Sequence, residues 1–284
     1  LSPSPELAAW RTLAVHLCDR RNAGEFAAGP GVKCYILAPG PRSNAGGALV
    51  AWTEGASTAG SVLEAYLGAG PIRVVDLYGN ERPADSSPTQ PTAVRVALSE
   101  SPVFIEGVDV NLVRCLAGII IDPAGLESGG EQQDRAIVIS NQWPVVLTGR
   151  VSILEPGGFG TGQRDRAWRI SPRTLRFQIP PGRTDRLPFS VGFSAGEEAG
   201  VKPFVMELDL QADTRHGPVT IHRDVEVSLQ GLRLDVTCTV RPAGDVVVEA
   251  AVSNDGREAR TLNVTVFAPG EPRRKGVIGE VKDR

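Results

Sequence analysis

The sequence predicts an all-β protein of tandem antiparallel β-sandwiches, preceded by one N-terminal α-helix. Three observations predict this class. Short runs in which apolar and polar residues alternate, such as residues 94–99, recur along the chain. The 32 Gly and 22 Pro supply turns between these runs. The length of 284 residues accommodates two or three sandwiches of about 100 residues each.

The first segment predicts a helix from about residue 6 to residue 21. Ser4 is placed to cap its N-terminus, and Pro5 fits the first helical position because its missing N–H is not needed there. Residues 22–24, Asn-Ala-Gly, are expected to end the helix. One apolar face is predicted from residues at spacings of three and four, namely Leu7, Trp10, Ala14, Leu17 and Cys18.

The strand pattern divides the chain into four parts. The helical part, 1–27, is expected to pack on a first sandwich of five to seven strands. Turn residues 230–231 are expected to form a linker between the last two parts of the chain. Seven runs spaced ten to twenty residues apart predict an immunoglobulin-like sandwich next, at 116–121, 136–140, 145–154, 174–179, 185–193, 204–212 and 219–229. The predicted domains are 1–27, 28–108, 109–230 and, as a partial second immunoglobulin-like sandwich, 231–284.

Composition excludes some classes of partner. The formal net charge is −3 and no long basic run occurs, so nucleic acid is not an expected partner. The excess of Arg over Lys, 26 to 4, is interpreted as compositional bias, with Arg-rich recognition as the alternative. No apolar run reaches about 18 residues, so no membrane span is predicted. The two ends suggest a fragment, and no signal peptide is recognised.

The cysteines lack metal-ligand spacing. Cys18, Cys34, Cys115 and Cys238 form no CxxC or Cys/His pattern, so no zinc site is predicted. We interpret Cys18 and Cys34 as small buried hydrophobic residues, with a Cys18–Cys34 disulfide as the open alternative.

Several short motifs together resemble a known arrangement. They are Val50-Ala51-Trp52, the hairpin 74–80 with its tip Tyr78-Gly79-Asn80, and the strand 101–107, where Ser-Pro precedes Val-Phe-Ile and Gly107 marks the border. These motifs resemble the β-sandwich that follows the catalytic (β/α)₈ barrel of multidomain bacterial glycoside hydrolases. Ala51 and Phe104 depart mildly from that pattern. Residues 136–141 and 151–153, Trp168 with Pro172 and the 181–182 turn are similar to the immunoglobulin-like modules that follow such barrels.

The resemblance implies a non-catalytic, structural or accessory region that supports a barrel absent from this chain. Its partners would be the neighbouring catalytic domain of the same protein and a polysaccharide or other glycan. Its location would be extracellular or periplasmic. The two catalytic carboxylates would lie on the barrel, so no residue of this chain inherits them.

The residues themselves offer no catalytic, metal or cofactor site. A glycosidase needs two carboxyl groups held on either side of the scissile bond. The positions of the acidic residues in this sequence identify no such pair. The histidines have no Cys or Ser partner at motif spacing. The glycine-rich run 157–162 lacks the Gly-Lys-Ser/Thr of a phosphate loop and is interpreted as a hairpin loop. The carboxylate and imidazole side chains that could have formed such a site belong to Asp76, Asp109, Asp122, Glu106, Glu155, His16, His216 and His222.

Aromatic rings could stack on sugars, and two residues are the candidates for glycan contact. Trp168, which lies among Arg164, Arg166 and Arg169, is expected to be exposed, and Tyr78 lies at a hairpin tip. Trp52 is interpreted as core. The sequon at Asn263 matters only in a host that glycosylates.

A second function class stays open. The chain could be an extracellular adhesion or protein-interaction module, unconnected with an enzyme, that binds another protein through edge strands or loops.

Overall fold

A computed structural model of the chain describes most of its length. The exceptions are residues 1–3, 30, 42–45, 55–60, 89, 91, 128–130, 157–167, 195–196, 198, 229–230, 242–245, 256–259, 267–273 and 282–284. The described part is mostly antiparallel β-sheet with two short helices, and the predicted all-β, immunoglobulin-like fold class is confirmed. The glycine-rich run 157–162 lies outside the described residues.

The first domain packs a larger sheet against a smaller one. Its inner faces meet in a core that contains Ile36, Leu49 and Ile105. The six-stranded sheet has the order β1 (Arg20–Glu25), β2 (Val32–Pro39), β3 (Gly47–Thr53), β9 (Val103–Val108), β5 (Arg73–Val75) and β6 (Glu81–Pro83). The three-stranded sheet has the order β4 (Val62–Ala65), β8 (Val94–Ala97) and β7 (Asp85–Ser86).

Helix α1 (Pro5–Leu17) lies on the outer face of the six-stranded sheet. The backbone N–H of Leu7 donates to Ser4 Oγ at 3.4 Å, so the predicted cap is present. The predicted end at residue 21 is wrong, because Cys18 caps the helix, Asp19 has a φ of 58°, and β1 begins at Arg20. Residues 22–24 therefore lie in a strand rather than in a helix terminus.

Helix α2 (Val110–Ala117) joins the two domains, and the sequence did not predict it. The strand expected at 116–121 is instead divided between the end of this helix and β10 (Ile120–Asp122). Leu112 and Leu116 enter the core of the second domain, whereas Val113 enters that of the first. The helix is therefore shared packing rather than a flexible linker.

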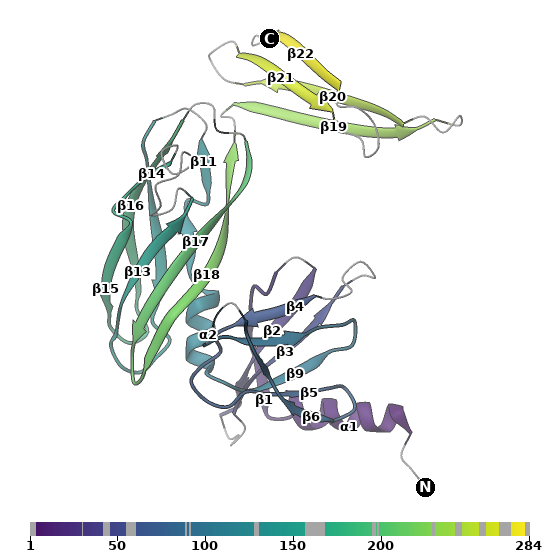
Figure 1. The fold of residues 1–284 in the computed structure, drawn as a ribbon, viewed down its shortest axis with the longest axis vertical. Helices are drawn as coiled ribbons and strands as arrows, with labels where there is room; N and C mark the ends of the chain where they lie inside the picture. The colour runs from purple at the N-terminus through teal and green to yellow at the C-terminus, as the bar shows by residue number, and fades with distance from the viewer. Residues whose placement is uncertain are drawn as a thin grey trace.

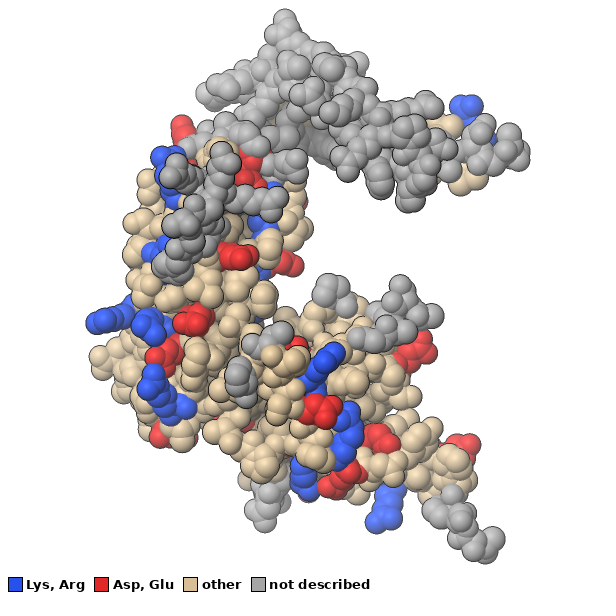
Figure 2. Space-filling view, in the orientation of Figure 1, with Lys and Arg blue, Asp and Glu red and all other residues tan. Residues whose placement is uncertain are grey.

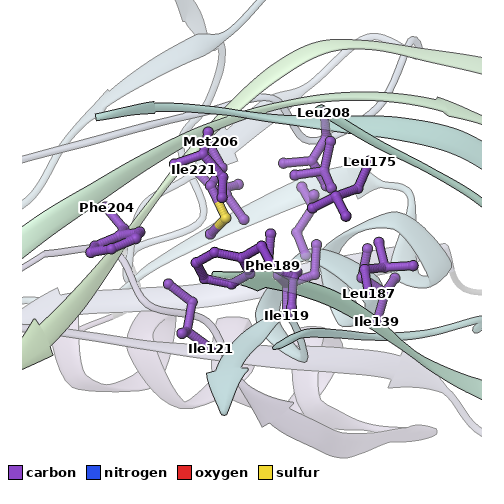
Figure 3. Packing of buried hydrophobic residues seen from close by; sticks show 14 of the residues in the cluster. Ile119, Ile121, Ile139, Leu175, Leu187, Phe189, Phe204, Met206, Leu208 and Ile221 are labelled. Atoms are coloured by element: carbon purple, nitrogen blue, oxygen red, sulfur yellow. The ribbon is translucent and has the colours of Figure 1, made fainter. Parts of the chain in front are cut away.

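The second domain is an immunoglobulin-like sandwich around one large core (Figure 3). Phe204, Met206 and Leu208 point inward from alternate positions of one strand, as a half-buried strand requires. One sheet has the order β10, β12 (Gln133–Ser140), β16 (Thr184–Phe193) and β14 (Trp168–Ser171). The other has the order β11 (Gly125–Glu127), β18 (Arg215–Ser228), β17 (Gly200–Gln211), β13 (Leu147–Glu155) and β15 (Thr174–Ile179), with β11 parallel to β18.

The C-terminal part forms two antiparallel hairpins. They are β19 (Leu232–Val240) with β20 (Val246–Asn254), and β21 (Arg260–Val266) with β22 (Arg274–Val281). The pairing of β19 with β20 runs without interruption over nine residue pairs. In Figure 1 these hairpins lie beyond the end of the second domain, away from α1.

Candidate functional site

An apolar groove lies on the outer face of the first domain, beside α1. Its floor is a row across three strands, because Tyr35 of β2 pairs with Val50 of β3, and Val50 pairs with Phe104 of β9. Side chains at alternate positions of a strand share a face, so Trp52 continues the floor on β3. The rings of Tyr35 and Trp52 lie with centroids 5.6 Å apart.

Helix α1 forms one wall of this groove. Leu13 and Leu17 line it from the helix, and Leu13 also packs on the buried ring of Phe104. The cavity has a volume of about 430 Å³. Its other lining residues are Asn22, Leu37, Glu100 and Pro102, of which only Asn22 and Glu100 are polar. The groove therefore offers a mostly apolar lining, to which Asn22 and Glu100 add polar side chains.

The outward side of α1 continues the apolar surface. We call Leu7, Trp10, Ala14 and Leu17 the α1 stripe. Leu7 is 60% exposed, Trp10 72% and Leu17 44%. The stripe is the face that was expected to pack on the domain, and that expectation is wrong: Thr12 is buried instead, and Leu13 packs on the sheet. Periodicity identifies which residues share a face but not which face meets the sheet.

A buried ionic cluster fixes the C-terminal end of α1. Arg20 donates to both carboxylate oxygens of Glu106, at 2.7 and 2.6 Å, and also to the backbone carbonyl of His16 at 3.0 Å. His16 Nδ1 lies 2.6 Å from Glu106 Oε1, and its ring stacks on Phe104 at 4.8 Å. Because Glu106 belongs to β9, these contacts join the helix end to the middle of the sheet.

The electrostatics of this cluster indicate an anchor rather than a catalytic acid. Burial raises the pKa of Glu106, but the hydrogen bonds from Arg20 and His16 outweigh burial, so the carboxyl pKa lies below its usual value. An ionised carboxylate whose two oxygens both accept bonds from Arg20 has no proton to donate. Glu106 therefore holds α1 in place.

A second cluster joins the two domains around His216, which is 1% exposed. Its Nε2 lies 3.1 Å from Thr214 Oγ1 and 3.7 Å from Asp109 Oδ2. On its other side, Nδ1 lies 3.5 Å from the hydroxyl of Tyr66 in the first domain. Asp109 also accepts from the Leu112 N–H and so caps α2.

Arg223 of β18 fastens the opposite end of α2. Its guanidinium donates to the backbone carbonyl of Leu116, in the last turn of α2, and to that of Ile119, which follows the helix. Burial lowers the pKa of this arginine. Both ends of α2 are thus held by side-chain contacts, one at Asp109 and one at Arg223.

The two residues predicted to contact glycan differ in their exposure to solvent. Trp168 was expected to be exposed, which is wrong: it is 6% exposed, packs on Phe193 with ring centroids 4.6 Å apart, and donates to Glu197 at 3.1 Å. Its neighbours cover its ring. Tyr78 is 54% exposed at the tip of the β5–β6 hairpin, and glycan contact there stays a prediction.

The other carboxylate and histidine side chains named from the sequence form turn contacts or ion pairs, or lie exposed on a strand. Asp76 accepts from the Tyr78 and Asn80 N–H groups and closes a turn, while Asp122 pairs with Arg186 at 2.6 Å. His222 is exposed on β18. No group of three or more His, Cys, Asp or Glu that could hold a metal occurs within the described residues.

The four cysteines are free thiols, so the alternative Cys18–Cys34 disulfide is not formed. Cys34 is buried as expected, but the expected burial of Cys18 is wrong, because it follows the last turn of α1 and is exposed. Cys115 is buried and Cys238 is exposed. Helices long and apolar enough to cross a membrane are absent from the part of the chain that the structure describes. On the face shown in Figure 2, acidic and basic side chains intermingle over the first two domains.

Sequence reasoning missed most of this surface. It interpreted Trp52 as core, whereas the residue is half-buried in the groove floor. One signal was present: Ala8, Thr12 and His16 recur every four residues and give α1 a second, smaller face that can lie close to a sheet.

Fold and site together define a protein of tandem immunoglobulin-like β-sandwiches with an apolar surface groove. No family model and no curated protein matches the sequence.

Solved structures with a similar fold were found at low similarity. The PapD-like domain 7 of human CEP192 shares 12% identity, with 39% of this chain and 84% of that domain covered and a TM-score of 0.26. The class 5 fimbriae chaperone CfaA shares 10% identity, with 59% of this chain and 83% of that chain covered and a TM-score of 0.25. A chain of the CsuC–CsuE chaperone–tip adhesion subunit complex of Acinetobacter baumannii shares 11% identity, with 59% of this chain and 90% of that chain covered and a TM-score of 0.23.

These neighbours correct the resemblance to glycoside hydrolases, which is wrong. The structures found are PapD-like and chaperone folds, and glycosidase modules are not among those that support the fold. The physical reason lies in the motifs that carried the resemblance. The 74–80 hairpin is closed by Asp76 bonding to its own turn, and such turn chemistry serves antiparallel sheets of many families.

Proposed function

We propose that this chain is a protein-interaction module, and that its docking surface is the groove together with the α1 stripe. The observation that carries the proposal is the exposure of Leu7, Trp10 and Leu17 on one side of α1, of which Leu17 also lines the apolar groove. Contiguous exposed apolar surface of this kind is typical of protein interaction sites, whereas apolar residues scattered singly are common on any surface.

The chemistry of the groove favours a protein segment as its ligand. Its floor and wall present mainly aliphatic and aromatic side chains, and Asn22 and Glu100 are the other polar residues of the lining. An apolar helical segment matches such a surface, because its anchors recur every three or four residues like those of the α1 stripe.

Selection of displayed peptides tests the proposal. The folded chain 1–284 is used as bait, and peptides that also bind a Trp10→Ser/Leu17→Ser variant are removed. The selected peptides are expected to carry apolar residues at helical spacing and to bind the wild type at least about tenfold more tightly, an effect of about 1.4 kcal/mol.

The control is Ile120→Ser in β10, because Ile120 is 51% exposed and lies in the second domain. This variant should bind the selected peptides as the wild type does. Peptides that bind all three proteins equally, or a selection without discriminating peptides, would contradict the proposal.

A further inference from the structure

The occupant of the docking surface can be inferred from the α1 stripe itself, and this inference rests on the proposed function. We propose that the occupant is α1 of a second copy of this chain. Two copies then associate through an antiparallel pair of α1 helices related by a twofold axis.

The stripe has the same spacing from either end. Its four residues follow one another at intervals of three, four and three along the helix. In an antiparallel pair, Leu7 of one copy therefore faces Leu17 of the other, and Trp10 faces Ala14. Each residue finds its counterpart twice, as an isologous interface requires.

The sizes of the facing residues are complementary. Trp10 is the largest side chain of the stripe and is 72% exposed, whereas Ala14 is the smallest. A large side chain opposite a small one allows two helices to pack closely, with ridges entering grooves. The same spacing with two tryptophans facing each other would hold the helices apart.

The groove completes the contact. Leu17 belongs to both the stripe and the groove wall, so Leu7 of the second copy, which faces Leu17, reaches the mouth of the groove. A stable interface buries about 800 Å² on each partner, more than one short helix face supplies alone. Tyr35 and Trp52 on the groove floor provide further apolar surface at this place.

Position and charge permit the pairing. Figure 1 shows α1 at the side of the first domain opposite the second domain, with its N-terminal turns reaching past the sheet. Glu6 lies in the first turn, and the exposed Asp19 and Arg21, of opposite charge, follow the last turn. An antiparallel pair therefore places Glu6 of one copy beside a helix end whose exposed charges balance, and it opposes the two helix dipoles.

Arg11 allows a second copy of this chain to be distinguished from a different protein as the occupant. It is exposed on the flank of the stripe and has no ion pair with a described residue. The twofold axis brings the two copies of Arg11 to the same flank near the middle of the pair, where they repel each other. Removing this charge should therefore strengthen self-association, whereas it should weaken binding of a partner helix that offers an acidic residue there.

Sedimentation velocity from low micromolar to submillimolar concentration tests the pairing. Wild-type chain is expected to shift from monomer towards dimer, Trp10→Asp and Leu17→Asp are expected to stay monomeric, and Arg11→Ala is expected to dimerise at least about threefold more tightly. Ile120→Asp should behave as the wild type, because it changes an equally exposed residue of the second domain. Circular dichroism verifies that each variant is folded.

Disulfide trapping tests the direction of the helices. In a Cys18→Ser/Cys238→Ser background, which removes the two exposed thiols, a mixture of Leu7→Cys and Leu17→Cys chains should give the crossed disulfide. Each chain alone should cross-link several-fold less. Preferential linkage of Leu7→Cys to itself would indicate parallel helices and overturn the proposal, as would a chain that is monomeric throughout the concentration range.

The two proposals fail in different ways. A monomeric chain that still selects discriminating helical peptides removes the second copy as occupant and keeps the docking surface. A monomeric chain that selects no such peptides removes both.

Discussion

Helix α1 leaves Leu7, Trp10 and Leu17 exposed, whereas α2 buries Leu112, Cys115 and Leu116 almost completely. Both helices carry several apolar residues, yet α2 buries most of them, whereas α1 contributes mainly Leu13 to the packing on the sheet. The difference arises from position: α2 lies between two domains and is covered from both sides, while α1 has a sheet on one side alone. Apolar periodicity in a helix therefore predicts burial only where a second packing surface exists.

Thiol reactivity should show the largest contrast between the helices. Cys18 caps α1 and is exposed, whereas burial raises the pKa of Cys115 in α2 to about 12. Because the thiolate is the reactive form, Cys18 should react with an aromatic disulfide at pH 8 about 10³-fold faster than Cys115. Mass spectrometry of each modified cysteine gives the rates. Cys34, whose pKa burial also raises to about 12, should behave like Cys115.

Truncating an apolar residue of each helix should change stability very differently. Leu112→Ala removes a side chain that is fully buried between domains and should lower the free energy of unfolding by about 2–5 kcal/mol. Leu7→Ala should change it by less than about 0.5 kcal/mol. Urea denaturation at protein concentrations below self-association measures both. Equal losses would show that α1 contributes to the core as α2 does.

The side-chain contacts at the end of α2 should also contribute measurably. Arg223→Ala removes the side-chain donor of the Ile119 carbonyl and one donor of the Leu116 carbonyl, which keeps the Ile119 N–H at 3.4 Å, and it should cost about 1–3 kcal/mol. The matched control is Arg186→Ala, which breaks an exposed pair with Asp122 and should cost about 1 kcal/mol or less. Chemical denaturation compares them, and a control as costly as Arg223→Ala would contradict this role.

The anchor of α1 should give the smallest effect and one that depends on pH. The pKa of Glu106 is lowered in the folded chain, so the stabilisation is present above the unfolded value of about 4.3. It is lost as the pH falls through the lower folded value. Glu106→Gln should therefore be less stable than wild type at pH 7, and the gap should narrow below about pH 4. A gap independent of pH would show that the charge of Glu106 is not what stabilises α1.

The sequence predicted those elements that carry their own signal. The strand expected at 174–179 is β15 residue for residue, because Leu175, Phe177 and Ile179 alternate with polar residues. Helix α1 was found because Ser4 and Pro5 mark its start. Helix α2 was missed because eight residues that include Val110 and Val113 resemble a strand when their neighbours are unknown.

The candidate site was less predictable than the fold. Its floor combines Tyr35, Val50 and Phe104, which are brought together only by strand pairing. The anchor joins His16 and Arg20 to Glu106, 86 or more residues away in the chain. No local pattern reports such contacts. The burial of Trp168 likewise depends on Phe193 and Phe204, which lie on other strands.

Glu106 has a consequence for mechanics. It lies on β9, which ends two residues later at Val108, and Asp109 then caps α2. A pull applied to α1 would therefore be shared between the chain leading into β1 and the contacts with Glu106 on β9, the strand that leads into α2. Part of a force on α1 would thus reach the junction of the two domains, where Asp109 and Arg223 hold the two ends of α2.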